Sequence, residues 1–177
     1  MRTLFLALLA LPLIAACQPQ TSISPVPAPT GALQGGAVET TEQERAGVLA
    51  SIQDFMVALR MRDTTAMYQH MDSLTHITLL RPAREGGTRV VVMTGRQFVA
   101  AVTRPGEPGI DEPIRNPDVH VSGDLATVWA EYQVRRDGNV THCGFDAFHL
   151  VRRNGRWMLL TIADTFQTTG CGPAWPR

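Results

Sequence analysis

Three turn signals at regular spacing constrain the fold more than any other feature of the sequence. They are Gly123-Asp124, Asp137-Gly138 and Asn154-Gly155. The last two favour two-residue hairpins, because Asp-Gly and Asn-Gly tolerate the positive φ that such turns require. The signals divide the last third of the chain into strands of about 118–122, 125–136, 139–153 and 156–168. The sequence therefore predicts a four-stranded antiparallel meander.

Three helices are expected before the meander. Thr41 and Glu44 have the spacing of a capping box, and apolar residues at helical spacing follow over about residues 42–61. Asp63 can cap a shorter helix that runs to about residue 71. Thr94 and Gln97 form a second capping box, which opens the third helix. Short strands are predicted between the second and third helices, over residues 75–80 and 89–93.

Tight turns also set the register, and the register assigns residues to faces of the sheet. An unbroken ladder from each turn places Gln133 opposite His142 and Trp129 opposite Asp146. One face then combines apolar and polar residues: His120, Thr127, Trp129, Glu131, Gln133, His142, Asp146, Phe148, Leu150, Trp157, Leu159, Thr161 and Thr165. The opposite face is apolar nearly throughout, and Asp164 falls on it, where a structural role is expected.

Glu131, His142 and Asp146 form the sharpest group on the mixed face. Carboxylate and imidazole groups in a partly dry pocket can perform general acid–base catalysis. The alternative is a hydrogen-bonded network that only lines a pocket or supports the sheet. No metal site is expected, because the five histidines show no tight ligand spacing.

The start of the chain predicts export. Residues 4–14 form an apolar run of signal-peptide length, which is too short to span a bilayer comfortably. Ile14-Ala15-Ala16-Cys17 resembles a bacterial lipobox, in which the cysteine receives a lipid. The alternative is an ordinary secretory signal followed by a chance cysteine. Gln18 resembles the signal for outer-membrane sorting, so we expect a lipid-anchored protein of the bacterial envelope, on the outer membrane and facing the periplasm.

Composition divides the rest of the chain. Residues 18–40 are rich in Pro, Gly, Ser and Thr, which predicts a flexible tether or, alternatively, a proline-motif ligand. We expect one domain over residues 41–172 and a short tail over 173–177. The formal net charge is zero, so nucleic-acid binding lacks its main driving force.

Two cysteines remain once Cys17 is assigned to lipid. Cys143 and Cys171 are an even number in an oxidising compartment, which favours a disulfide. The alternative is a buried free Cys143 and a loose Cys171. A disulfide would fix the carboxy-terminal tail to the sheet.

The order of helices and strands resembles the nuclear-transport-factor-2-like (NTF2-like) superfamily. Three segments of this chain resemble the SnoaL-like and lumazine-binding branches of that superfamily: His142 to Phe148, Asn154 to Trp157, and Asp164-Thr165. The resemblance implies an α+β cone, in which three helices pack on a strongly curved antiparallel sheet. It also implies that the mixed face turns inward; the alternative is that the more apolar face packs on the helices. An apolar outer face must be covered, since large exposed apolar patches mark interfaces, so we expect a homodimer through it.

These expectations lead to one leading function. The domain is expected to bind a small, partly apolar molecule without a cofactor and without catalysis. The pocket would be lined by His120, Trp129, Glu131, Gln133, His142, Asp146, Phe148, Thr161 and Thr165. The alternatives are a purely structural dimer and an enzyme like the ketosteroid isomerases, acting as isomerase, dehydratase or hydrolase. In that enzyme Asp146 or Glu131 would be the base, together with His142.

Overall fold

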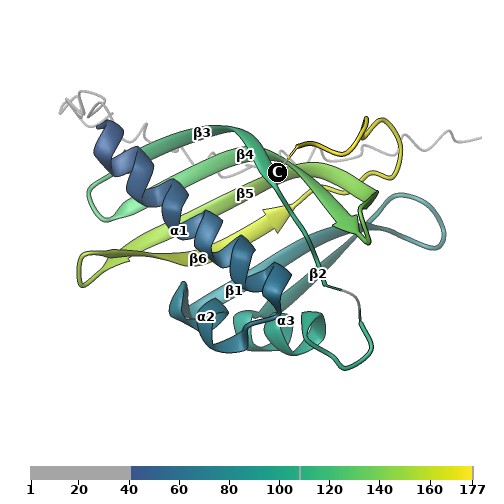
Figure 1. The fold of residues 1–177 in the computed structure, drawn as a ribbon, viewed down its shortest axis with the longest axis horizontal. Helices are drawn as coiled ribbons and strands as arrows, with labels where there is room; N and C mark the ends of the chain where they lie inside the picture. The colour runs from purple at the N-terminus through teal and green to yellow at the C-terminus, as the bar shows by residue number, and fades with distance from the viewer. Residues whose placement is uncertain (1–40, 108, 177) are drawn as a thin grey trace, which may run out of the picture. The chain divides into compact units, whose positions relative to one another are not determined.

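The structure is a computed structural model that describes residues 41–107 and 109–176 (Figure 1). Cys17 and the tether predicted over residues 18–40 lie outside the described residues. The elements are α1 (Glu42–Met61), α2 (Thr64–Gln69), β1 (Met71–Pro82), β2 (Thr88–Thr94), α3 (Gly95–Val102), β3 (Ile114–Ser122), β4 (Leu125–Arg136), β5 (Asn139–Arg153) and β6 (Arg156–Asp164). The predicted α+β class is confirmed.

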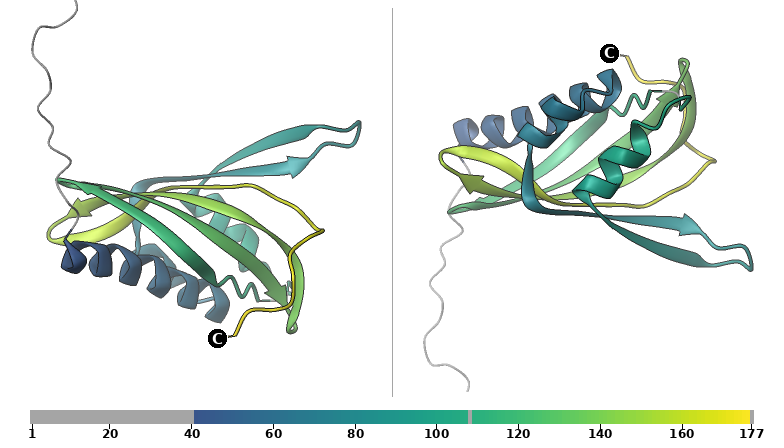
Figure 2. Two further views of the ribbon diagram at one scale, coloured as in Figure 1. Left: turned by 90° about the horizontal axis from the view of Figure 1, so that it is seen from above. Right: turned by 90° about the horizontal axis from the view of Figure 1, so that it is seen from below.

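The six strands form one sheet in the order β2-β1-β6-β5-β4-β3. The meander β3 to β6 is antiparallel, as expected, but β1 lies parallel to β6. The expectation of a purely antiparallel sheet is therefore wrong at this one pair, because the β1–β2 hairpin joins the meander beside its last strand. Figure 2 shows the helices on one side of the curved sheet and the tip of the β1–β2 hairpin extending beyond it.

The helices begin where the capping boxes predict. Thr41 and Glu44 cap α1 reciprocally, and Thr94 and Gln97 do the same for α3. The helix α1 crosses the concave side of the sheet (Figure 1). It buries Val48, Ile52, Phe55, Met56, Ala58 and Leu59 in a core shared with the sheet. In the part of the chain that the structure describes, no helix is both long and apolar enough to cross a membrane.

A β-bulge between β4 and β5 changes the register expected from the Asp137-Gly138 turn. The turn forms, and Arg136 pairs with Asn139, but Thr141 is an extra residue. Val134 therefore lies opposite His142, where an unbroken ladder would place Gln133. Because side chains alternate along a strand, one extra residue moves every later residue to the other face relative to the partner strand.

A second bulge lies between β5 and β6, where Leu160 is the extra residue. Leu150 pairs with Leu159, and His149 pairs with Thr161. Beyond this bulge Asp146 faces Asp164, so Asp164 lies on the inner side of the sheet. The expectation that Asp164 lies on the outer face is wrong for this reason.

The two bulges correct the predicted faces. The inner residues of β3 and β4 are the buried apolar ones: Val119, Val121, Ala126, Val128, Ala130, Tyr132 and Val134. The inner residues of β5 are His142, Asp146, Phe148 and Leu150, as the sequence predicts. The outer face is mixed rather than apolar, since its partly exposed residues include Leu125, Thr127, Trp129, Glu131, Phe145 and His149.

Candidate functional site

A cavity of about 250 Å³ lies between the concave side of the sheet and helices α1 and α3. Most of its wall is apolar: Phe55, Met56, Leu59, Ile77, Leu79, Met93, Phe98, Ala101, Val102, Ile110, Val134 and Ile162. The remaining wall is ionisable: Arg81, Glu112, Arg136, His142, Asp146 and Asp164. A largely apolar cavity with a few converging polar groups is typical of a small-molecule site.

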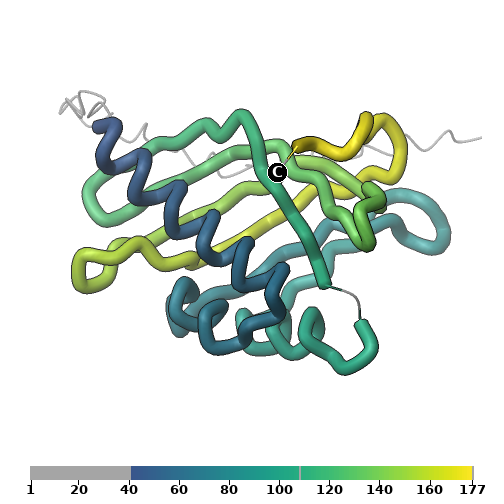
Figure 3. The backbone as a smooth tube through the Cα atoms, in the orientation of Figure 1, coloured from purple at the N-terminus to yellow at the C-terminus, as the bar shows by residue number. Residues whose placement is uncertain are grey.

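Three carboxyl groups reach the cavity from different parts of the chain. Asp146 and Asp164 are directly opposite each other on β5 and β6. Glu112 lies in the connection between α3 and β3, which Figure 3 shows leading from the α3 side of the domain to the edge strand. The backbone of Asp111 bonds to Arg135 of β4 on one side of Glu112, and the Pro113 carbonyl accepts from Gln133 on the other. This pairing fixes Glu112 at the end of the cavity.

Asp146 is the most unusual residue of the wall. It is 0% exposed, and among the described residues its carboxyl group is hydrogen-bonded only to another acid, Glu112. Burial, the charge of Glu112 and the charge of Asp164 raise the pKa of Asp146 well above its ordinary value. Two carboxyl groups bond to each other only while they hold a proton, so an ionised Asp146 has acceptor capacity that no N–H donor of the described residues fills.

Glu112 and Asp164 differ in how their charge is balanced. Asp164 accepts a hydrogen bond from Arg81 at 2.6 Å and another from the Leu80 backbone at 3.1 Å. Glu112 makes no ion pair within residues 41–107 and 109–176. Burial and the charge of Asp164 raise the pKa of Glu112 to about 7. The cavity therefore contains one carboxylate paired with Arg81 and two acids that are bonded to each other and have no ion pair of their own.

His142 lies beside these acids as a neutral ring. It packs edge-on against Tyr132, with ring centres 5.9 Å apart, and against Phe166 at 4.6 Å. Burial and the charges of Arg81 and Arg136 lower the pKa of His142 to about 4. Burial and the neighbouring carboxyl groups raise the pKa of Tyr132, whose hydroxyl donates to the Thr165 carbonyl. Neither ring carries a charge near neutral pH.

Two of the residues predicted for the pocket line the cavity: His142 and Asp146. Phe148 lies on the same side of β5 but is fully buried in the hydrophobic core. Their roles in binding or catalysis stay predictions. The structure does bring the predicted imidazole and one predicted carboxyl group to the same cavity.

The third residue of the predicted catalytic group does not reach the cavity. Glu131 lies on the outer face, where it is bonded to Arg115 at 2.7 Å and to Asn116 at 2.9 Å. These partners lower the pKa of Glu131. The first bulge is the physical reason, because it puts Glu131 and Asp146 on opposite faces.

Four other predicted pocket residues also lie away from the cavity. Trp129 is 49% exposed and stacks on Phe145, with ring centres 5.2 Å apart. His120 is exposed beside Asp118, and Thr161 bonds to His149 on the outer face. Thr165 follows the end of β6 and accepts a hydrogen bond from the Phe145 backbone.

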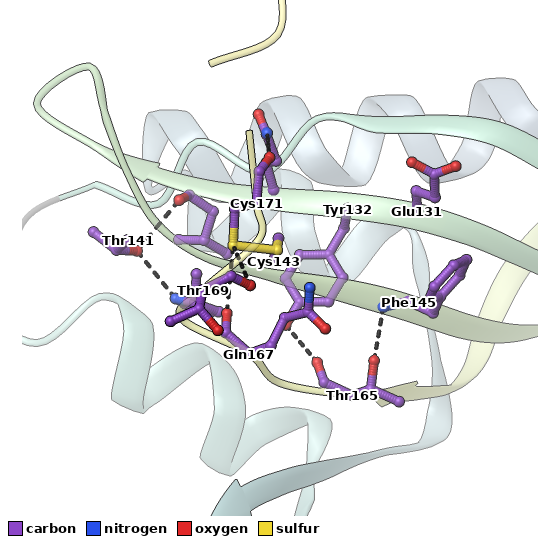
Figure 4. The surroundings of a disulfide bond; sticks show 12 residues. Glu131, Tyr132, Thr141, Cys143, Phe145, Thr165, Gln167, Thr169 and Cys171 are labelled. Atoms are coloured by element: carbon purple, nitrogen blue, oxygen red, sulfur yellow. Dashed lines mark hydrogen bonds between the residues drawn. A yellow bond between two sulfur atoms is a disulfide. The ribbon is translucent and has the colours of Figure 1, made fainter. Parts of the chain in front are cut away.

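Gln133, the last predicted pocket residue, is buried under the carboxy-terminal segment. We call residues 165–176 the strap. A Cys143–Cys171 disulfide joins the strap to β5 (Figure 4). The Gln133 amide donates to the carbonyls of Cys171 and Pro173 and accepts from the Trp175 backbone. Its role in the structure is therefore to fix the strap to β4.

The sequence interpretation missed four ionisable residues of the cavity: Arg81, Glu112, Arg136 and Asp164. Glu112 lies in a Pro- and Gly-rich stretch that was interpreted as a loop, and Arg81 follows a predicted strand. Asp164 was assigned to the wrong face. The one available signal was the Asp164 carboxyl group itself in an otherwise apolar strand, since a buried charge needs a partner.

A larger hollow of about 680 Å³ lies elsewhere, between the start of β1 and the start of α3. Tyr68 and Leu74 on its wall are exposed, and its carboxylate, Asp72, is already paired with Arg153 at 2.9 Å. It lacks a buried polar group without a partner. The cone cavity is therefore the stronger candidate, although it is smaller.

Metal binding finds no support in the described residues, which contain no group of three or more His, Cys, Asp or Glu placed to hold an ion.

No protein-family profile matches the sequence, and no curated protein matches it either. Solved structures do match. A protein of unknown function with a cystatin-like fold from Nostoc punctiforme aligns with a TM-score of 0.60 and 18% identity, over 74% of this chain and 96% of that chain. An NTF2-like protein from Cytophaga hutchinsonii aligns with a TM-score of 0.57 and 12% identity, over 69% and 97%.

A third match, an NTF2-like protein of unknown function from Shewanella baltica, has a TM-score of 0.54 and 15% identity over 72% of this chain and 98% of its own. At such identities the likeness concerns the fold alone. It agrees with the helices and the curved sheet described above. The domain therefore has the NTF2-like fold.

Proposed function

We propose that the domain binds a small, partly apolar organic molecule in the cone cavity, with Asp146 as its polar anchor. The observation that carries this proposal is a fully buried carboxyl group whose hydrogen-bond partner among the described residues is only another acid, Glu112. Once the pair loses its proton, a buried acceptor without a donor costs about 1–3 kcal/mol, and a ligand that donates to it would remove that cost. The apolar wall would hold the body of the ligand.

The size of the cavity limits the ligand. At about 250 Å³ it is below the roughly 300–1,000 Å³ of typical drug-sized sites. A single ring or a short branched chain fits this volume better than a multi-ring compound. Phe55 and Phe98 are the aromatic side chains of the apolar wall that would surround the ligand.

A thermal-shift screen of single-ring and short-chain compounds tests the proposal. Wild-type protein should be stabilised by a subset of compounds, and Asp146→Asn should lose that response. Glu131→Gln is the matched control, because it changes a carboxylate on the outer face. An absence of stabilisation across the library, or equal responses in all three proteins, would contradict the proposal.

A second candidate is proton-transfer catalysis as an isomerase, dehydratase or hydrolase. Two acids with raised pKa values in a buried cavity favour it, since a general acid or base works best with a pKa near the working pH. Asp146 would be the base, with neutral His142 beside it. Turnover of epoxide or cyclic ketone substrates that disappears in Asp146→Asn would support this candidate over binding alone.

We also propose that the chain is a lipoprotein of the bacterial envelope, anchored through Cys17 to the outer membrane and facing the periplasm. The lipobox-like sequence supports this, and so does the disulfide, since disulfides persist in oxidising compartments. Mass spectrometry of the membrane fraction should find a lipid on Cys17. Recovery of Cys17→Ser in the same fraction would contradict the anchor.

A homodimer through the outer face of the sheet completes the proposal. The exposed Trp129–Phe145 stack and Leu125 support it, because clustered apolar surface marks interfaces. Sedimentation of the purified protein should give a dimer, and Trp129→Ala should shift it toward monomer. A wild-type monomer at high concentration would contradict it.

A further inference from the structure

We infer that the cone cavity selects an organic cation, namely a primary or secondary amine on a small apolar body, whose ammonium group binds between Asp146 and Glu112. This inference rests on the proposed function, because it names the ligand class of the same cavity. It follows from how the charged side chains of the wall are paired.

Both arginines of the wall already pair with other acids. Arg81 bonds to Asp164 at 2.6 Å, and its guanidinium also lies over the Phe166 ring at 5.0 Å. Arg136 lines the cavity and lies 3.7 Å from Glu107, which is not part of the cavity wall. Neither arginine forms an ion pair with Asp146 or Glu112.

The remaining polar groups of the wall cannot supply a cation either. His142 is neutral near pH 7, since its pKa is lowered to about 4. Tyr132 donates its hydroxyl to the Thr165 carbonyl. Asp146 and Glu112 are therefore bonded to each other and have no ion pair of their own, and in the empty cavity they must share a proton or repel each other.

An ammonium group complements these two acids better than other ligand groups do. A primary ammonium group carries three N–H donors, a secondary one carries two, and neither has an acceptor, which matches carboxyl groups that can only accept once ionised. A hydroxyl offers one donor and leaves the charge of the acids unbalanced. A carboxylate or phosphate ligand would add a further negative charge, and charge-assisted hydrogen bonds favour the cation over both.

The affinity should depend on pH in a defined direction. Glu112, Asp146, Asp164, Arg81, Arg136 and His142 line the cavity around the ammonium position, and Tyr132 packs against His142. As pH rises, Asp146 and Glu112 lose their protons and attract the ammonium group more strongly. Affinity for the amine should therefore rise from about pH 5 to about pH 8, below the pKa of about 10 that alkyl amines have.

Calorimetric titration with three matched probes tests the inference on the full-length protein. The probes are cyclohexylmethylamine, cyclohexylmethanol and cyclohexanecarboxylate, which share a ring and differ in the polar group. We expect the amine to bind at least about tenfold more tightly than the alcohol near pH 8, and the carboxylate to bind most weakly. Asp146→Asn and Glu112→Gln should each reduce amine affinity by about tenfold or more, while Glu131→Gln leaves it unchanged.

Two results would overturn the inference. If the alcohol bound as tightly as the amine, the cavity would still bind small apolar molecules but would not select cations. If none of the three probes bound, the proposed function would fail together with the inference. Circular dichroism of each variant confirms that a lost affinity does not reflect unfolding.

Discussion

Gln133 and Asp146 lie on neighbouring strands, and both are 0% exposed. Gln133 points to the outer side of the sheet, where the strap satisfies its amide with three hydrogen bonds. Asp146 points to the inner side, where its only hydrogen-bond partner among the described residues is a second acid, Glu112. The same degree of burial thus accompanies three bonds to backbone groups on one face and only a bond between two acids on the other.

The difference separates a structural polar group from a candidate binding group. A buried group whose bonds are all made inside the protein stabilises the fold and has no capacity left for a ligand. A buried group with free acceptors destabilises the empty protein until something donates to it. The predictions below each change one side of this contrast.

The largest effect is expected from loss of the disulfide. Cys171→Ser should lower the free energy of unfolding by about 2–4 kcal/mol, because the bond closes a loop with a sequence separation of 28 residues. Urea denaturation of the purified protein measures the loss. Reducing agent should destabilise wild type by a similar amount and leave Cys171→Ser unchanged, and a stable reduced wild type would contradict the role of the strap.

Removal of the Gln133 amide should have the next largest effect. Gln133→Leu should lower the free energy of unfolding by about 1–2 kcal/mol, since three backbone groups of the strap lose their partner. The double variant Gln133→Leu/Cys171→Ser should lose less than the sum of the single losses, because both changes release the same segment. Strict additivity would contradict a shared strap.

Asp146→Asn should act in the opposite direction and should depend on pH. The pKa of Asp146 is raised in the folded protein, so its favourable contribution is present at low pH and is lost as pH rises through that pKa. Asparagine does not ionise, so the variant should gain stability over wild type by up to about 1.4 kcal/mol for each pH unit in this window.

Urea denaturation of Asp146→Asn and wild type at about pH 5, 6.5 and 8 measures this difference. The lowered pKa of His142 makes stability rise with pH between about pH 4 and 6.5. That contribution is present in both proteins and cancels in the comparison. A difference that stays constant with pH would mean that Asp146 titrates as an ordinary carboxyl group.

The smallest effect is expected at Glu131. Its ion pair with Arg115 is partly exposed, and such pairs contribute at most about 1 kcal/mol. Glu131→Gln should therefore change the free energy of unfolding by less than that and should leave ligand binding intact. A large loss of binding in this variant would mean that Glu131 belongs to the binding site.

The sequence predicts the elements of this fold well and their faces only in part. Capping boxes and hairpin turns are local signals, so α1, α3 and the meander could be located from a few residues each. The bulges at Thr141 and Leu160 have no local signal in the sequence, and each reverses the alternation beyond it. For this reason the sequence predicts Asp146 and Glu131 together on the inner face, although only Asp146 lies there.

Glu112 and Arg81 could not be assigned to the cavity from the sequence for a different reason. Glu112 reaches it because the segment before β3 pairs with β4, and Arg81 reaches it because β1 lies beside β6. Both contacts are long-range pairings that periodicity does not report. The candidate site therefore emerges only when these segments are brought together.

The most direct test is the titration of the Asp146 carboxyl carbon by NMR, with the signal assigned by its absence in Asp146→Asn. A buried carboxyl group that is bonded only to a second acid should titrate with a midpoint well above the ordinary value of about 3.9, and addition of a bound amine should lower that midpoint. A midpoint near the ordinary value in the free protein would mean that Asp146 is solvated or paired, and it would contradict the cavity as a binding site.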